Sequence, residues 1–261
     1  MTTLRWTERQ RALLGAMGIR LFAPAAAPAP VAAPVSAPAS APAALLAPSP
    51  QPLPTAPAHD ALALDWPSLR AAVQACRACP LGATRTQAVF GVGHPRAHWM
   101  IVGEAPGEQE DLQGEPFVGA SGQLLDHMLR ALGLTRAEGP PERQVFIANT
   151  LKCRPPKNRN PEPAETAQCA PYLARQIALV QPRILLAMGR FAAQALLNSD
   201  EPVGKLRGRV HRVGGVPLVV TYHPAYLLRS PADKARAWED LCLAAEHAAV
   251  RAEPQGQADA R

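Results

Sequence analysis

The stretch "HWMIVGEAPGEQEDLQGEPFVGASGQLLDHMLRALG", residues 98–133, changes pattern twice along its length. Its apolar start at 98–103 predicts a buried strand. The middle part, 104–120, is rich in Gly and Pro and carries five carboxylates. The last part repeats apolar residues at helical spacing, with Ser121 placed to cap the helix and Gly133 placed to end it. A buried strand that runs into an irregular loop and then a helix is typical of the site-bearing edge of an α/β protein.

Three further apolar stretches predict buried strands, at 144–150, 183–189 and 216–223. The helical patterns that follow them span 161–181, 190–198 and 231–251. This alternation predicts an α/β fold in which a mostly parallel four-stranded sheet is covered by helices on both faces, giving three α/β/α layers. Sites in such sheets form at the carboxyl ends of the strands.

Two of these helices carry more specific expectations. Pro171 should bend or interrupt the helix over 161–181, because proline removes a backbone donor. The helix over 231–251 should turn one face to the core, formed by Trp238, Leu241, Cys242 and Ala245.

The composition divides the chain of 261 residues into four segments. Residues 23–60 are mostly Ala and Pro and lack the apolar side chains that offset ordering entropy, so we expect a disordered linker. Residues 1–22 are expected to contain a short amphipathic helix, 61–251 the folded domain and 252–261 a disordered tail. No apolar run approaches the ~18 residues that span a bilayer, so we expect a cytoplasmic protein without signal peptide or membrane contact.

Basic residues suggest a polyanionic partner. The net charge is +6 and the pI about 9.4. Eight of the Lys and Arg residues lie in two loop-like stretches, 152–159 and 205–212, and Arg229 lies in a third. Such loops are either solvated surface or the lining of a groove beside a phosphate backbone.

Five cysteines need an explanation. Cys242 lies on an apolar helical face and is expected in the core. The other four, at positions 76, 79, 153 and 169, could form two disulfides, one metal site or no site at all. Disulfides conflict with a cytoplasmic protein, whereas one four-cysteine site accounts for all four. Zinc and an iron–sulfur cluster both accept four thiolates, and one C-x-x-C plus two distant ligands favours the cluster.

Three polar side chains sit at strand ends and should share a crevice. Glu104, Asn149 and His223 each lie at the end of a predicted strand. An acid, an amide and an imidazole together suggest polar recognition combined with acid–base or charge-stabilising chemistry. Phe117 lies in the Gly/Pro-rich loop, where it either packs in the core or lies flat against a planar ligand.

The motifs "GEAPGEQEDLQGEPFVGASGQLL", "NTLKCRPPKNRNP" and "HPAYLLR", in this order and interleaved with the cysteines, resemble those of the family 4 (iron–sulfur) uracil-DNA glycosylases. The resemblance covers roughly residues 66–249. It implies the uracil-DNA glycosylase fold, with a parallel sheet between helices, and a 4Fe-4S cluster held by Cys76, Cys79, Cys153 and Cys169.

The resemblance also implies roles for the pocket residues. In these enzymes the target uracil is rotated out of the DNA stack. Phe117 would then stack on uracil, and the Asn149 amide would pair with its O4 and N3–H edge. His223 would donate a hydrogen bond to the charge developing on O2, assisted by backbone N–H groups near Glu104 and Ala105. Glu104 would position the water that attacks the sugar.

The expected partner is uracil-containing DNA, single- or double-stranded, bound without sequence preference by a monomer associated with the nucleoid. Leu227 would wedge into the duplex. The expected phosphate contacts are Lys152, Arg154, Arg159 and Arg229. Residues 3–21 are either a frayed end or a docking peptide for another protein.

Three alternatives to this interpretation agree less well with the sequence. A related branch binds covalently to the abasic sugar through a histidine, but none lies between Cys153 and Cys169, so the resemblance implies a monofunctional enzyme. A cluster-containing binding module with a vestigial pocket conflicts with the intact set of Glu104, Phe117, Asn149 and His223. A zinc-stabilised nucleotide hydrolase would need a phosphate loop, and "GEAPGE" lacks that signature.

Overall fold

The structure is a computed structural model that describes residues 60–250. The expected N-terminal helix (1–22), the docking peptide within it (3–21) and the tail (252–261) lie outside the described residues. The expected linker (23–60) also lies outside them, apart from Asp60, which begins the first short helix.

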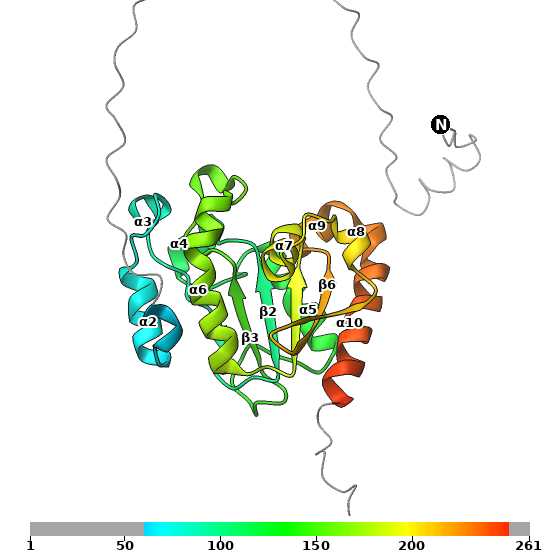
Figure 1. The fold of residues 1–261 in the computed structure, drawn as a ribbon. Coiled ribbons are helices and arrows are strands. Elements are labelled where there is room, and N and C mark those ends of the chain that lie inside the picture. The colour runs from blue at the N-terminus through cyan, green and yellow to red at the C-terminus, as the bar shows by residue number, and fades with distance from the viewer. Residues whose placement is uncertain (1–59, 251–261) are drawn as a thin grey trace, which may run out of the picture. The chain divides into compact units, whose positions relative to one another are not determined.

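A single sheet forms the centre of the described region (Figure 1), with strand order β1-β3-β2-β4-β6-β5. Its strands are β1 (Val92–Gly93), β2 (Trp99–Gly103), β3 (Val145–Asn149), β4 (Ile184–Met188), β5 (Val210–Val213) and β6 (Val216–Thr221). The four expected strands form its parallel centre, β3-β2-β4-β6. The expected strand number was too low, because β1 and β5 add antiparallel edges.

The two extra strands escaped the sequence analysis for different reasons. β1 has two residues, too few for a pattern. β5 lies partly in the stretch 205–212, which was expected to be a loop but contains the end of helix α8 (Val203–Leu206) and the start of this strand. Its residues are only partly buried or exposed, so its sequence lacks the apolar run that marked the central strands.

The central strands alternate between two hydrophobic cores. In β2, Met100 and Val102 belong to one cluster, and Trp99 and Ile101 belong to the other. This period of two follows from strand geometry, and the burial of both faces explains the near-continuous apolar sequence. Each core therefore needs its own covering layer of helices.

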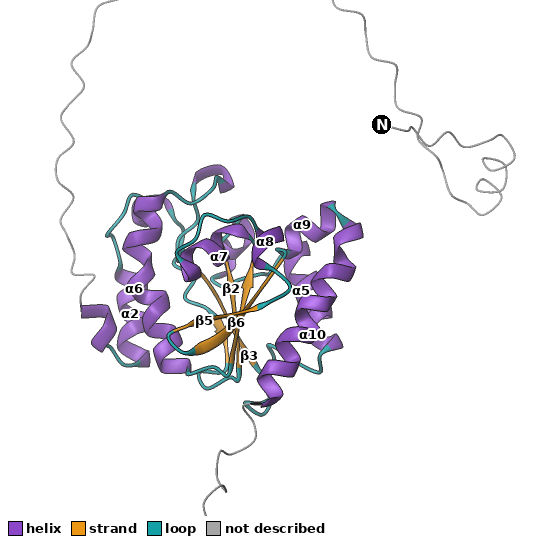
Figure 2. Ribbon diagram, turned by 45° about the vertical axis from the view of Figure 1, so that its right-hand side comes forward, coloured by secondary structure: helices purple, strands orange, loops and turns teal. Residues whose placement is uncertain are grey.

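The helices supply those two layers (Figure 2), which confirms the expected three-layer α/β/α fold. One layer contains α2 (Trp66–Ala75), α6 (Pro163–Val180), α7 (Arg190–Leu197) and α8. The other contains α5 (Ala120–Ala131) and α10 (Lys234–Val250). Short helices complete the described chain: η1 (Asp60–Ala63), α3 (Leu81–Thr84), α4 (Glu108–Gln113), η2 (Pro156–Asn158), α9 (Pro224–Arg229) and η3 (Pro231–Asp233).

One expected helix cap was wrong, and one expected interruption does not occur. Helix α5 is capped by Gly119, so Ser121 lies inside its first turn, whereas Gly133 ends it as expected with a φ of 73°. Helix α6 continues through Pro171 without interruption. Its start is fixed by a capping box, in which the Glu165 carboxylate accepts from the Glu162 backbone N–H at 2.9 Å.

The inward face of α10 is rotated from the expected one. Leu241 and Ala244 are buried, but the Trp238 side chain is 44 % exposed, and Cys242 is only partly buried. The polar residue Asp240 is fully buried instead, because its carboxylate accepts hydrogen bonds from the Arg207 side chain at 3.0 Å and the Gly208 backbone N–H at 3.1 Å. A buried acid with such partners is invisible to a hydrophobic pattern.

Candidate active site

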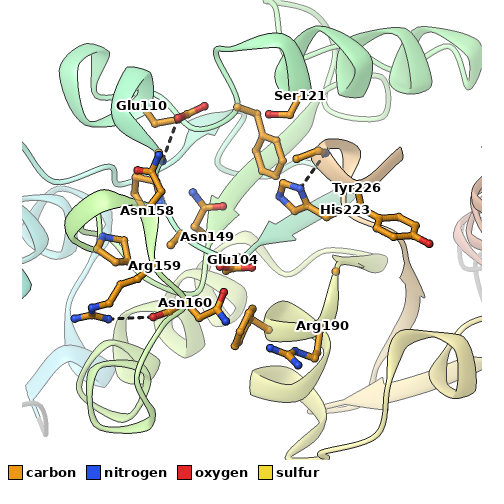
Figure 3. Close-up of a pocket in the computed structure, with 18 of the residues that line it drawn as sticks. Glu104, Glu110, Ser121, Asn149, Asn158, Arg159, Asn160, Arg190, His223 and Tyr226 are labelled. Carbon is orange, nitrogen blue, oxygen red and sulfur yellow. Dashed lines mark hydrogen bonds between the residues drawn. The ribbon is translucent and has the colours of Figure 1, made fainter. Parts of the chain in front are cut away.

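The carboxyl edge of the parallel strands surrounds a cavity of about 740 Å³. Its walls include all five residues that the sequence assigned to the reaction or to the base, which are Glu104, Ala105, Phe117, Asn149 and His223. Figure 3 shows the labelled Glu104 and Asn149 side by side in the middle of the pocket, with His223 next to them. The sequence expectation that these distant segments meet is therefore met by the geometry.

Hydrogen bonds across the sheet edge fix Glu104 beside Asn149. The Thr150 backbone N–H donates to Gly103 O, and the Leu151 backbone N–H donates to Glu104 O, both at 3.0 Å. The Thr150 hydroxyl also donates to Glu104 O. Asn149 is 3 % exposed, and no hydrogen bond from another described residue reaches its side-chain amide. The amide is thus held at the cavity wall with its donors and acceptor available.

Gly103 permits the close approach of two other site residues. A Cβ at this position would lie 2.4 Å from Asn149 Oδ1 and 2.6 Å from Phe117 Cζ. Phe117 itself has a φ of 56°, a left-handed conformation that is uncommon for a bulky residue and clusters at functional sites. Its ring stacks on the His223 ring, with centroids 5.3 Å apart and planes inclined by 26°. The backbone of the loop therefore aims Phe117 into the cavity.

His223 is both the cap of helix α9 and a wall of the cavity. Its Nδ1 accepts a hydrogen bond from the Ala225 backbone N–H at 3.1 Å, so the ring proton of the neutral form lies on Nε2. Burial, and then the positive charge of Arg229, lower the pKa of His223 to about 4. At neutral pH the imidazole is consequently uncharged and offers an Nε2–H donor.

Glu104 is half-buried and is a stronger base than an exposed carboxylate. Burial raises its pKa, and the guanidinium of Arg190 opposes that shift. Arg190 lines the same cavity, where its guanidinium lies 4.5 Å from the centroid of the Phe191 ring. This Arg–Phe pair was not expected from the sequence, because neither residue belongs to a motif.

Two of the loop acids had no role expected from the sequence, and the structure shows that they accept hydrogen bonds that hold the loop in place. The Glu110 carboxylate accepts from the Gly107 backbone N–H at 3.0 Å and from the Val118 backbone N–H at 3.1 Å, joining the two ends of the loop. Asp111 is buried and accepts from the Thr86 backbone N–H with both oxygens. Glu110 lies three residues after Gly107, the N-cap of α4, which is the spacing of the acid in a capping box, and this spacing could have been recognised in the sequence.

Two residues expected on DNA are buried, which contradicts the expectation. Lys152 is 1 % exposed, and its Nζ donates to Asn149 O at 2.7 Å and to Gln176 Oε1 at 2.6 Å. Leu227 is also 1 % exposed, whereas the next residue, Leu228, is 45 % exposed. Neither buried side chain reaches solvent, since each faces the packed side of its segment.

The other basic residues remain at the surface, two of them in ion pairs. Arg159 binds the buried Glu165 carboxylate through both terminal nitrogens, at 2.9 and 2.6 Å, and lines the cavity (Figure 3). Arg154 lies 3.6 Å from Glu108. Arg229 is exposed, lines the cavity and makes no ion pair within the part of the chain that the structure describes.

The four cysteines singled out in the sequence line a second, small cavity. Its walls include Cys76, Cys79, Cys153 and Cys169 together with Lys152, Arg85 and Tyr172. The thiols are free, and two accept hydrogen bonds: Arg85 Nη1 donates to Cys153 Sγ at 2.9 Å, and the Lys152 backbone N–H donates to Cys169 Sγ at 3.3 Å. Across residues 60–250, no three Cys, His, Asp or Glu side chains are close enough to hold a single metal ion.

Known proteins are similar to this chain in sequence. Residues 90–242 match the family described as the "Uracil DNA glycosylase superfamily". The type-4 uracil-DNA glycosylase of Archaeoglobus fulgidus is 43 % identical over 61 % of this chain and 81 % of its own length. Those of Pyrobaculum aerophilum (42 % identical, 69 % of this chain, 93 % of its own length) and Sulfurisphaera tokodaii (44 %, 61 % and 74 %) are similar to the same degree.

This chain belongs to the uracil-DNA glycosylase superfamily, and within it to the type-4 group. The sequence resemblance is thereby confirmed for family and fold. Among the described residues of this uracil-DNA glycosylase family member, no helix combines the length and apolar character that crossing a bilayer requires.

Proposed function

We propose that this chain is a monofunctional uracil-DNA glycosylase, which hydrolyses the N-glycosidic bond of uracil flipped out of DNA and leaves an abasic site for base excision repair. The observation that carries the proposal is the convergence of Glu104, Asn149 and His223 on one cavity at the carboxyl edge of the sheet. An acid, a free amide and a neutral imidazole match the groups that such a reaction needs.

Asn149 is the proposed determinant of base choice. Its fixed and unpaired amide can accept from N3–H of uracil and donate to O4, while Phe117 provides an aromatic face for the ring. Cytosine presents the opposite donors and acceptors on that edge, so it would leave a buried amide badly paired. Sites that depend on such pairing discriminate strongly, because a lost partner leaves a desolvated polar group.

Bond breaking is proposed to depend on stabilisation of the leaving base. The C1′–N1 bond breaks, and its electron pair departs with uracil as an anion whose charge reaches O2. The Nε2–H of His223 donates to that oxygen without transferring a full charge, which suits an imidazole that stays neutral. Glu104 and Ala105 line the same cavity, and their backbone N–H groups are the further donors proposed for that oxygen.

Glu104 is proposed to complete the hydrolysis. Its carboxylate favours the oxocarbenium-like sugar electrostatically and orients the water that adds to C1′. The water proton passes to the Glu104 carboxylate and then to solvent. The half-buried position and raised pKa support this role, since both make the carboxylate a better proton acceptor.

The DNA backbone is proposed to bind the exposed cations at the mouth of the pocket. Arg229 has no competing ion pair among the described residues, whereas Arg154 and Arg159 are partly neutralised by Glu108 and Glu165. Leu228 replaces Leu227 as the side chain that can enter the space left by the base, because it is the exposed one.

The four-cysteine cavity is proposed to hold a 4Fe-4S cluster. The donor set fits: four thiols line one cavity, and N–H groups of Arg85 and Lys152 already donate to two of the sulfurs. When bound, the cluster supplies cross-links between the C-x-x-C segment, the loop after β3 and helix α6. Lys152 and Gln176 then tie that braced region to the backbone of Asn149.

The test is release of uracil. A single-uracil oligonucleotide is incubated with the holoprotein, and free uracil and alkali-labile sites are quantified against a thymine control. Asn149→Ala should remove most of the activity, and Gln123→Ala, which truncates an exposed amide on α5 outside the cavity, should not. Full activity of the Asn149 variant, or absence of uracil release by the wild-type holoprotein, refutes the proposed function.

A further inference from the structure

One wall of the active-site cavity has no role in the chemistry proposed above. Besides the residues around Asn149, the cavity of about 740 Å³ is lined by Tyr222 and Tyr226, next to Arg229. That volume lies in the range of about 300–1,000 Å³ that holds ligands of drug size, so it has room for more than one pyrimidine ring. Figure 3 shows Tyr226 beside His223 at the margin of the pocket, with its hydroxyl directed away from Asn149.

Tyr226 is exposed although its ring is held in place. It is 37 % exposed, and among the exposed large apolar side chains of the described region it is the one that lines this cavity. Its hydroxyl donates to Asp233 Oδ2 at 2.7 Å. Its ring stacks on Tyr222, with centroids 5.2 Å apart and planes inclined by 23°. An exposed aromatic ring fixed at two points has little conformational entropy left to lose on binding.

Tyr222, the other ring of this stack, is also held in place. The Arg207 guanidinium lies 5.8 Å from the centroid of Tyr222. Arg207 is itself bound to the fully buried Asp240 at 3.0 Å and to Glu239 at 3.1 Å. The pair therefore rests on helix α10 through a buried ion pair. These contacts indicate that the two tyrosine rings form a rigid aromatic surface.

We propose that the Tyr222–Tyr226 pair is a stacking platform for the nucleobase next to uracil in the same strand, with Arg229 placed for the phosphate that joins the two nucleotides. This inference rests on the proposed function. Uracil seated against Asn149 brings its flanking nucleotides to the cavity mouth, where this platform lies. Aromatic faces accept any base, so the platform adds affinity without reading sequence.

The test couples a change in the DNA to a change in the protein. Single-stranded substrates carry one uracil and a tetrahydrofuran abasic unit at either the 5′ or the 3′ neighbour, and kcat/KM is measured for each. For the wild-type holoprotein, removing the stacked neighbour should lower kcat/KM roughly 5- to 100-fold, the range expected for loss of one base–aromatic stack. Removing the other neighbour should have a smaller effect.

The protein variants decide whether Tyr226 carries that effect. Tyr226→Ala should lower kcat/KM on the intact strand by the same factor and lose its sensitivity to the abasic neighbour. Tyr226→Phe keeps the ring and should retain the sensitivity, although it lacks the bond to Asp233. Trp238→Ala is the matched control, since it removes an exposed aromatic ring that does not line the cavity.

Two results overturn the platform. One is a wild-type enzyme that tolerates the abasic unit at both neighbours, a result that needs no variant to fold. The other is a Tyr226→Ala enzyme that is as sensitive to the abasic neighbour as the wild type. Either leaves the proposed function standing as long as uracil is released, whereas absence of uracil release by the wild type refutes the function itself.

Discussion

Gly103 and Asn149 are register partners on neighbouring strands, and a Cβ on Gly103 would lie 2.4 Å from Asn149 Oδ1. We expect Gly103→Ala to displace the amide and the Phe117 ring, which lies 2.6 Å from the same point. A shift of about 1 Å at a reacting site can lower the rate about 100-fold, so kcat/KM for uracil release should fall to that degree. Gly204→Ala is the control, since no atom lies within 4 Å of its added Cβ. Equal activity of the two variants would contradict the packing described here.

Glu104 should set the acid limb of the pH–rate profile. Only the ionised carboxylate orients water, and burial raises the pKa of Glu104. Activity should therefore fall, as pH is lowered, at a higher pH than an exposed carboxylate would give. His223 titrates only near pH 4, so protonation of its ring should matter at the acid extreme alone. Profiles of kcat/KM for wild type and Glu104→Gln check this: the variant should be slow and lack the limb, and an unmoved limb in the variant would assign it to another group.

Glu104 should also lower stability. Because its pKa is raised on folding, the cost of burying the carboxylate is present above the folded-state pKa and disappears as pH falls through the unfolded-state value. Glu104→Gln should therefore raise Tm at neutral pH, and the gain should vanish at low pH. Thermal melts at several pH values measure this. A variant destabilised at neutral pH would show that the carboxylate makes favourable contacts instead.

The residues that the sequence placed correctly share a simple property: each follows a continuous apolar run. Glu104 and His223 lie one and two residues beyond the ends of β2 and β6, Asn149 is the last residue of β3, and parallel strands end at one edge. The sequence failed at Lys152, because a basic residue in a Pro-rich loop has the composition of surface. Its burial depends on Gln176, a partner 24 residues away on α6, which no local pattern reveals.

Leu227 is an apolar residue whose burial the sequence could not reveal either. A six-residue helix such as α9 gives too few turns to reveal which of two adjacent leucines faces inward. Tyr226 and Leu228 are exposed on either side of it, and only the packed structure distinguishes them. The edge strands and the Arg190–Phe191 pair were missed because neither has an apolar run or a motif.

Lys152 should behave as a positioning residue and Arg229 as a phosphate contact. Lys152→Met leaves Asn149 O and Gln176 Oε1 without their donor, which costs about 1–3 kcal/mol of folding free energy for a buried polar group. Its DNA affinity should keep the wild-type dependence on salt. Arg229→Gln should instead leave Tm nearly unchanged and reduce the slope of log K against log salt by about 1. Measuring both quantities for both variants distinguishes the roles, and a reduced salt slope for Lys152→Met would restore the original sequence expectation.

Cys169 and Cys242 form a matched pair for testing the cluster, because both lie on helices but only Cys169 lines the four-cysteine cavity. The holoprotein should contain iron and sulfide and absorb visible light through iron–thiolate transitions. Cys169→Ser should lose most of the iron and lower Tm, since the links between α6, the loop after β3 and the C-x-x-C segment are lost together. Cys242→Ser should keep both. A colourless wild-type protein with one zinc per chain, or iron retained fully by Cys169→Ser, would contradict the assignment.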